Sequence, residues 1–215
     1  MKQSTKEILL DLQKRYPALG ECQESIERAA ELLIRTYRDG GKVLACGNGG
    51  SASDALHIIG ELMKSFVIKR RIRPEVETAI RKTCDADADL LCERLEGALP
   101  AISLVGEAAL VTAYSNDTAP ELAFAQQVYG HGRPGDLLIG ISTSGNSRNV
   151  IYAAEVARAM GMHTLALTGA GGGKLSLVSD CTVAVPERET YRIQELHLPV
   201  YHALCLAVEN EFFGG

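Results

Sequence analysis

The chain has 215 residues, 46% of them hydrophobic, which is enough to bury the core of one sizeable domain. A formal net charge of −5 argues against a nucleic-acid partner, which would need a basic face, and the N-terminus lacks the apolar core and cleavage site of a signal peptide. The six cysteines form no CxxC pair and mostly lie in apolar runs, as reduced core thiols do. We expect a single cytoplasmic domain over residues 1–215, with no membrane span.

Two amphipathic helices are expected before the first strand. Apolar residues recur at helical spacing in residues 4–16 and again in residues 21–38, and a glycine pair at 40–41 ends the second helix. This N-terminal helical pair, residues 1–40, lies outside the predicted sheet. Such pairs often pack against another subunit, which we hold as a hypothesis.

The stretch VLACGNGGSASDALHIIGE, residues 43–61, is the centre of the chain. It predicts a buried strand, a glycine loop and a helix whose first turn is capped by Ser51 or Ser53. Free backbone N–H groups at such a helix start favour an anion, most often phosphate. His57 and Glu61 are four residues apart and therefore leave the same helix face. The alternative interpretation is a tight connection with a surface ion pair, since the loop fits neither GxGxxG nor a P-loop.

Residues 64–99 interrupt the alternation of strands and helices. The basic run KRRIRP, residues 69–74, precedes a charged segment that predicts one or two short helices joined at DADAD, residues 85–89. This segment is too charged to be core, so we expect a solvated excursion over the sheet. The alternative hypothesis makes Lys64 and the basic residues 69–73 a lid over an anionic substrate.

The rest of the chain repeats the order strand, polar loop, helix, which predicts a doubly wound parallel α/β sheet with helices on both faces. An apolar run at 109–114 precedes a predicted turn, SND, at 115–117, and GAGGGK at 169–174 predicts a flexible turn. We expect strands at 100–105, 136–141, 163–169 and 181–186, and helices at 121–129, 149–160 and 191–212.

The run STSGNS, residues 142–147, is a second polar centre. It follows a buried strand and leads into a helix, so its hydroxyl and N–H groups point to the edge of the sheet where ligands bind. A helix cap with a polar turn would need only one serine. The density of hydroxyls therefore favours an anion site.

With GNGGSASDALHIIGE, SND, STSGNS and RIQELHLPVYH in this order, the chain resembles the sugar isomerase (SIS) domain family and, within it, the phosphoheptose isomerases. The resemblance covers nearly everything except about residues 67–99, which look like an insertion. It implies a homotetramer with sites between subunits and isomerisation of sedoheptulose 7-phosphate to D-glycero-D-manno-heptose 7-phosphate. The implied sugar-phosphate site consists of Asn48, Gly49, Gly50, Ser51, Asn116, Asp117, Ser142, Thr143, Ser144, Ser147 and Gln194.

The resemblance also implies one zinc ion per subunit, with the ligands His57, Glu61, Gln194 and His202. It makes Glu61 and His202 the acid–base pair. Glu61 moves a proton between adjacent carbons, and His202 transfers a proton at the oxygen or the proton on the opposite side. Gln194 and His202 are about 12 Å apart along an ideal helix, so spacing alone favours His197, one turn from Gln194. A distortion at Pro199, or ligands from neighbouring subunits, would resolve this conflict.

Other functions are compatible with the same resemblance. Non-catalytic SIS proteins that bind a replication initiator lack the helix glutamate and the final histidine, whereas this chain keeps Glu61 and His202. A regulator that senses sugar phosphates would need a DNA-binding segment, which the sequence lacks. An isomerase of another ketose phosphate remains an alternative, because an arginine expected soon after the glutamate is absent, leaving Lys64, Lys69 or Arg70 as substitutes.

Overall fold

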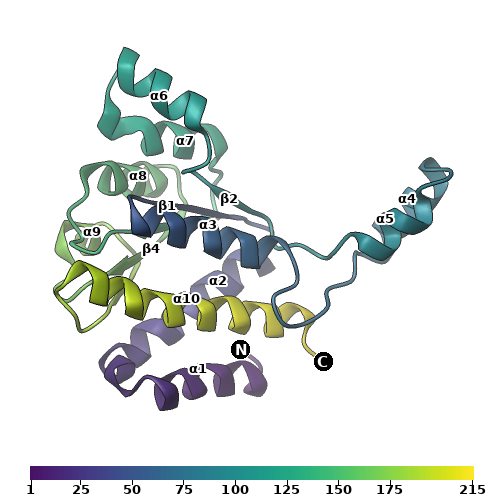
Figure 1. Cartoon of the computed structure of the whole chain (residues 1–215), viewed down its shortest axis with the longest axis horizontal. Coiled ribbons are helices and arrows are strands. Elements are labelled where there is room, and N and C mark those ends of the chain that lie inside the picture. The colour runs from purple at the N-terminus through teal and green to yellow at the C-terminus, as the bar shows by residue number, and fades with distance from the viewer.

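A five-stranded, all-parallel sheet organises the chain, which a computed structural model describes over residues 1–215 (Figure 1). The strand order is β2-β1-β3-β4-β5. The strands are β1 (Val43–Gly47), β2 (Ala101–Ser103), β3 (Leu137–Ile141), β4 (His163–Thr168) and β5 (Cys181–Ala184). The chain moves from β1 to one side of the sheet and then returns to the other, so the direction of winding reverses between β1 and β3. The doubly wound α/β fold expected from the sequence is confirmed.

Helices cover both faces of this sheet (Figure 1). None of them combines the length and the apolar composition needed to cross a lipid bilayer. The α-helices are α1 (Gln3–Arg15), α2 (Gln23–Arg38), α3 (Gly50–Met63), α4 (Pro74–Thr83), α5 (Ala88–Arg94), α6 (Ala108–Asp117), α7 (Ala123–His131), α8 (Arg148–Ala159), α9 (Gly173–Leu177) and α10 (Thr190–Phe213), and the 3₁₀ turns are η1 (Pro17–Cys22) and η2 (Pro120–Leu122).

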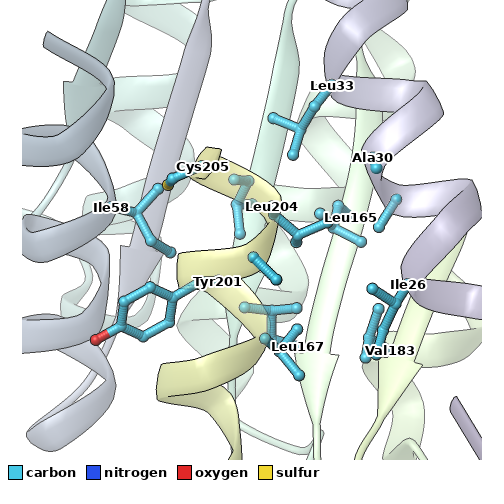
Figure 2. Packing of buried hydrophobic residues seen from close by; sticks show 14 of the residues in the cluster. Ile26, Ala30, Leu33, Ile58, Leu165, Leu167, Val183, Tyr201, Leu204 and Cys205 are labelled. Atoms are coloured by element: carbon cyan, nitrogen blue, oxygen red, sulfur yellow. The ribbon is translucent and has the colours of Figure 1, made fainter. Parts of the chain in front are cut away.

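Two hydrophobic cores lie on opposite faces of the sheet. The larger, of 34 buried residues, joins α1, α2, α3 and α10 to the sheet. In Figure 2, Leu33 of α2 and Ile58 of α3 lie on either side of Leu204 of α10, with Leu165 and Leu167 of β4 beneath. The smaller core, of 14 residues, joins α7, α8 and α9 to the other face. Burial on both faces explains the continuous apolar strands, and it leaves ligand binding to the loops at the strand ends.

Most elements lie where the sequence predicts them, including the N-terminal helical pair, whose first helix packs on α10 of the same chain. Some local predictions are wrong. The residues 115–117 are the last turn of helix α6 rather than a turn after an apolar run, since the alanine-rich segment before them favours a helix. The glycine run at 171–173 does not form only a flexible turn but enters the short helix α9.

The inserted residues 74–94 form a helical hairpin, α4 and α5, that projects away from the body of the protein (Figure 1). We call this hairpin the arm. The two short helices predicted around DADAD are confirmed, but the excursion does not lie over the sheet. No residue of α4 is buried, and Ala88 is the one buried residue of α5. The high charge of the segment explains why it stays outside the core.

A buried ion pair holds the chain just before the arm. Arg70 and Glu209 both have fully buried side chains, with Nε of Arg70 2.8 Å from Oε1 of Glu209. Glu209 also accepts the backbone N–H groups of residues 66–68. Arg70 in turn donates to the carbonyl oxygens of Glu61 and Leu62, at 2.9 and 2.7 Å. Arg70 therefore satisfies the orphan carbonyls at the end of α3, and it is not part of a lid.

Candidate active site

Two polar loops meet at the point where the winding of the sheet reverses. One follows β1 and leads into α3, and the other follows β3 and leads into α8. Asn48 of the first loop and Asn149 of α8 exchange two side-chain amide hydrogen bonds of 2.9 Å. In open α/β sheets this switch point is where ligands bind. The two glycine- and serine-rich runs singled out in the sequence therefore form one site, which we call the cradle (residues 48–51 and 142–147).

Both helices that begin at the cradle lack a side-chain cap. The residue before α3 is Gly49 and the residue before α8 is Ser147, and neither provides a capping hydrogen bond. Ser51 is buried within the first turn of α3, so the prediction that Ser51 or Ser53 caps this helix is wrong. Two uncapped helix starts at one place offer unpaired N–H groups and two positive dipole ends, an arrangement that favours a dianion such as phosphate.

The hydroxyls of the second loop are used within the loop or left facing outward. Ser142, which is buried, donates to Oγ of Ser147 at 3.0 Å, and Ser144 Oγ accepts the N–H of Asn146 at 3.1 Å. Ser144 is exposed and Thr143 half-buried. Hydroxyl groups therefore lie at the rim of the cradle, and none of them caps the first turn of α8.

Gly145 fixes the shape of this second loop. It has φ +65°, and a Cβ there would overlap the carbonyl group of Gly172. We expect Gly145→Ala to lose about 1–2 kcal/mol from the left-handed backbone alone and to displace the loop. Thermal denaturation with and without inorganic phosphate should show a lower Tm and a smaller ligand-induced shift. Gly130→Ala, at an open position of α7, is the control and should keep the ligand shift; equal shifts in both variants would contradict this role.

The other expected substrate contacts fall into two groups. Gln194 of α10 lies directly over the cradle, because a Cβ on Gly50 would overlap its side-chain amide. Asn116 and Asp117 lie on the last turn of α6, are exposed, and hydrogen-bond to each other rather than to the cradle. Within one chain the structure therefore brings Gln194 to the cradle but does not bring Asn116 and Asp117 there.

A cluster of one carboxylate and two imidazoles lies further along α3 and α10. Nε2 of His57 is 3.3 Å from Oε1 of Glu61 and 3.5 Å from Nε2 of His202. The Glu61 side chain is only 12% exposed, and its other oxygen is 3.2 Å from Nζ of Lys64. Burial and then the neighbouring His57 lower the pKa of His202, against the opposing effect of Glu61, so His202 is neutral at neutral pH.

Asp54 and Tyr201, which sequence reasoning missed, orient His57. The Tyr201 hydroxyl donates to Oδ1 of Asp54 at 3.4 Å and lies 3.0 Å from Nδ1 of His57. With its proton directed to Asp54, the hydroxyl oxygen accepts Nδ1–H of His57, which leaves Nε2 as a free lone pair toward Glu61 and His202. The signal was present in the sequence: Asp54 precedes His57 by one turn, and Tyr201 adjoins His202.

The donor set of this cluster fits a zinc ion in part. Zinc bonds of 2.0–2.1 Å at tetrahedral angles separate two ligand atoms by about 3.3 Å, close to both distances from Nε2 of His57. As they lie, the side chains do not converge as a completed metal centre. The two distances nevertheless leave room for a cation between these atoms. Gln194 is not part of this cluster, since it contacts Gly50 two turns before His202 along an unbroken α10.

His197, which helical spacing favours as the neighbour of Gln194, faces the sheet instead. It is fully buried, its Nε2 lies 3.1 Å from the carbonyl oxygen of Thr168, and burial lowers its pKa to about 4. Pro199 does not interrupt α10, so no distortion there brings Gln194 to His202. A distortion at Pro199 therefore does not explain the ligand spacing.

Comparison with known proteins identifies the family. The sequence model described as SIS domain matches residues 18–103 and 87–169. The chain belongs to the SIS domain family. A phosphoheptose isomerase of Akkermansia muciniphila is 37% identical over 215 residues, which is 100% of both chains. A phosphoheptose isomerase of Helicobacter pylori is 40% identical over 207 residues, 96% of this chain and 94% of that protein.

Solved structures agree with this placement within the family. The phosphoheptose isomerase of Neisseria gonorrhoeae has a TM-score of 0.72 at 33% identity, over 95% of this chain and 98% of that one. The phosphoheptose isomerase of Francisella tularensis has a TM-score of 0.73 at 31% identity, over 97% and 100%. This SIS protein is thus an enzyme of the aldose–ketose isomerase class.

Proposed function

We propose that this SIS enzyme interconverts sedoheptulose 7-phosphate and D-glycero-D-manno-heptose 7-phosphate, with Glu61 and His202 as the acid–base pair. The observation that carries the proposal is that one helix, α3, starts at the anion cradle and bears Glu61 beside His202 further along. His57 is seven residues from Gly50, about 10 Å along the axis. An extended seven-carbon phosphate spans a similar length at about 1.2 Å per bond, so its phosphate and its carbonyl would reach the two ends together.

The reaction moves a hydrogen between C1 and C2 through an enediolate. Glu61, largely screened from solvent, removes a proton from the carbon beside the carbonyl and returns it to the neighbouring carbon. His202, neutral because its pKa is lowered, accepts the proton of one oxygen and donates it to the other. The carbon and oxygen protons balance, and neither residue is consumed.

Zinc is the metal we propose for this site, held by His57, Glu61 and His202. When bound, it would polarise the substrate carbonyl and stabilise the negative oxygen of the enediolate. A carboxylate or an imidazole nitrogen fixed on a metal cannot act freely as a base, so the proposal requires that both Glu61 and His202 be weak or exchangeable ligands. The Lys64 contact with the second oxygen of Glu61 offers an alternative partner for the carboxylate.

We further propose a cytoplasmic homotetramer in which neighbouring subunits complete the site. All six cysteines are unpaired, as in a reducing compartment. Helix α6, which bears Asn116 and Asp117, has no buried residue in the single chain although it is rich in apolar side chains. A second subunit covering α6 would bury that surface and place both residues at a substrate. The same assembly would supply Gln194 from a different chain than His202.

Substrate length provides the test of this function. Turnover, followed by NMR, should be highest with sedoheptulose 7-phosphate and at least tenfold lower with fructose 6-phosphate, because the six-carbon sugar is one carbon shorter than the span from the cradle to the cluster at His57. Equal or better turnover of the shorter sugar would identify a different ketose phosphate as the substrate. Thermal stabilisation by both sugars without any turnover would instead indicate a binding protein.

Tyr201→Phe tests the orientation of His57 apart from catalysis. Loss of the hydroxyl frees the Nδ1 side of His57, and loss of such an outer partner typically weakens a metal site by about 10–100-fold. We expect zinc affinity, measured by competition with a chromophoric chelator, to fall within that range. The control Tyr152→Phe removes an exposed hydroxyl on α8 that contacts only Arg148 and should leave the affinity unchanged. Unaltered zinc binding in Tyr201→Phe would remove Tyr201 from the site.

A further inference from the structure

The arm leaves the body of the protein with its apolar side chains uncovered. Leu90 is 57% exposed and Leu95 48%. Val76 and Ile80, two apolar residues one turn apart on α4, are only half-buried. Helices as short as α4 and α5 are marginal in water unless an apolar face is packed. Figure 1 shows nothing of the same chain beside the hairpin beyond its point of departure. The arm therefore needs a partner that the single chain does not provide.

Charge is divided along the length of the arm. The segment leading into α4, residues 69–73, has four cationic side chains and no carboxylate, and we call it the base. The turn between the helices and the first turn of α5 have Asp85, Asp87 and Asp89 at exposed positions, and we call this region the tip. Asp89 is paired with Arg81, at 2.6 Å, whereas Asp85 and Asp87 have no cationic partner in the chain. Lys82, beside the tip, is the one cation there without a partner, and Arg73 of the base is paired with Glu75. The unpaired charges thus leave a small acidic excess at the tip.

The base also has unpaired charge and an open hollow. Arg70 is occupied by Glu209, but Lys69 and Arg71 are exposed and have no ion-pair partner in the chain. They line a cavity of about 420 Å³ together with Arg94 and the carboxylates Glu93 and Glu96. The other two cations in its lining are already paired, Arg70 with Glu209 and Arg81 with Glu77. The unpaired side chains leave a small basic excess in the hollow, opposite in sign to the tip.

We propose that the arms of two copies of this chain pair antiparallel. Asp85 and Asp87 at the tip of each arm then contact Lys69 and Arg71 at the base of the other. A two-fold axis makes both contacts equivalent, and it aligns opposite charges at both ends. A parallel pairing would oppose tip to tip and base to base, with like charges in contact. The pairing also covers Leu90 and Leu95. It does not depend on the chemistry of the active site, so it stands or falls separately from the proposed isomerisation.

Zero-length cross-linking measures this contact directly. Helix α4, ten residues long, spans about 15 Å, so Lys69 at the base cannot reach Asp85 or Asp87 of its own chain. A 1:1 mixture of ¹⁴N- and ¹⁵N-labelled protein is treated with a water-soluble carbodiimide. We expect cross-links from Lys69 to Asp85 or Asp87, about half of them between differently labelled chains. The Lys64–Glu61 pair, 3.2 Å apart within one chain, is the internal control. Control links without any base–tip link would overturn the proposal.

Charge reversal gives a second readout that does not depend on the cross-linker. The tip variant carries Asp85→Lys and Asp87→Lys, and the base variant carries Lys69→Glu and Arg71→Glu; all four side chains are exposed, so the body should fold normally. Hydrogen exchange of residues 74–94 should be at least tenfold faster in either variant alone than in the wild type. Mixing the two variants restores opposite charges at both ends and should restore protection. Equal exchange in the wild type, both variants and the mixture would contradict the pairing.

Discussion

Glu61→Gln is expected to lower kcat for sedoheptulose 7-phosphate by about 10³-fold, within the range that a positioned general base contributes. The amide keeps the size of the side chain and its place beside His57, but it cannot accept the carbon-bound proton. The cradle lies more than two helical turns away, at the start of α3, and is unchanged. Substrate-induced thermal stabilisation should therefore persist while turnover is lost.

Two comparisons make this result specific. Glu31→Gln removes an exposed carboxylate of α2 far from the cradle and should leave kcat unchanged. Zinc content, measured on the same Glu61→Gln sample, separates loss of the proton-accepting carboxylate from loss of the metal. Activity within twofold of the wild type in a metal-loaded Glu61→Gln sample would remove Glu61 from its assigned role.

Arg70→Met should be strongly destabilising, at about 3–5 kcal/mol. The change leaves Glu209 as a buried charge without its cation, and it removes the Arg70 donors from the carbonyl oxygens of Glu61 and Leu62, of which the latter keeps the N–H of Leu99. At about 2–4 °C per kcal/mol for a domain of this size, the Tm should fall by about 6–20 °C. Urea denaturation gives the free energy of unfolding.

A double variant and an exposed pair serve as controls. Adding Glu209→Gln to Arg70→Met removes the stranded charge, so the double variant should lose less than the sum of the two single changes. Arg15→Met breaks an exposed i,i+4 pair with Asp11 and should cost less than about 1 kcal/mol. A loss below 1 kcal/mol for Arg70→Met as well would show that the buried pair is not a main anchor of α3.

The same pair also sets a pH dependence. Burial alone would raise the pKa of Glu209, but the N–H groups of residues 66–68 and Arg70 outweigh it and lower that pKa. Because the pKa is lowered on folding, this contribution is complete above the unfolded pKa of about 4.3 and is lost as the pH falls through the folded pKa. Stability from this site is therefore constant at neutral pH and decreases only in acid.

Local sequence patterns were sufficient to predict the sheet and the position of the cradle. The abrupt change from apolar runs to glycine or serine after β1 and β3 marks strand ends, and parallel strands bring such ends to one edge. The four-residue spacing of His57 and Glu61 was enough to place them together. These features depend on residues that are close in the chain.

Contacts between segments that are distant in the chain could not be predicted from the sequence patterns. Arg70 and Glu209 are 139 positions apart, so nothing in the spacing distinguishes this buried pair from a lid residue and a surface acid. Helical spacing equally favoured His197, because a period of 3.6 residues does not show which face of α10 meets the sheet. The direction of the arm depends on where its two ends leave the body, which no local pattern contains.

The proposed metal-dependent proton transfer by Glu61 on a seven-carbon sugar phosphate can be measured directly. Turnover of sedoheptulose 7-phosphate by the purified protein is followed after chelation and then after return of one equivalent of Zn²⁺, with the product identified by NMR. We expect no turnover without metal, recovery on zinc addition, and D-glycero-D-manno-heptose 7-phosphate as product. Full activity in the chelated protein, or no heptose phosphate from a zinc-loaded and correctly folded sample, would contradict the proposed reaction.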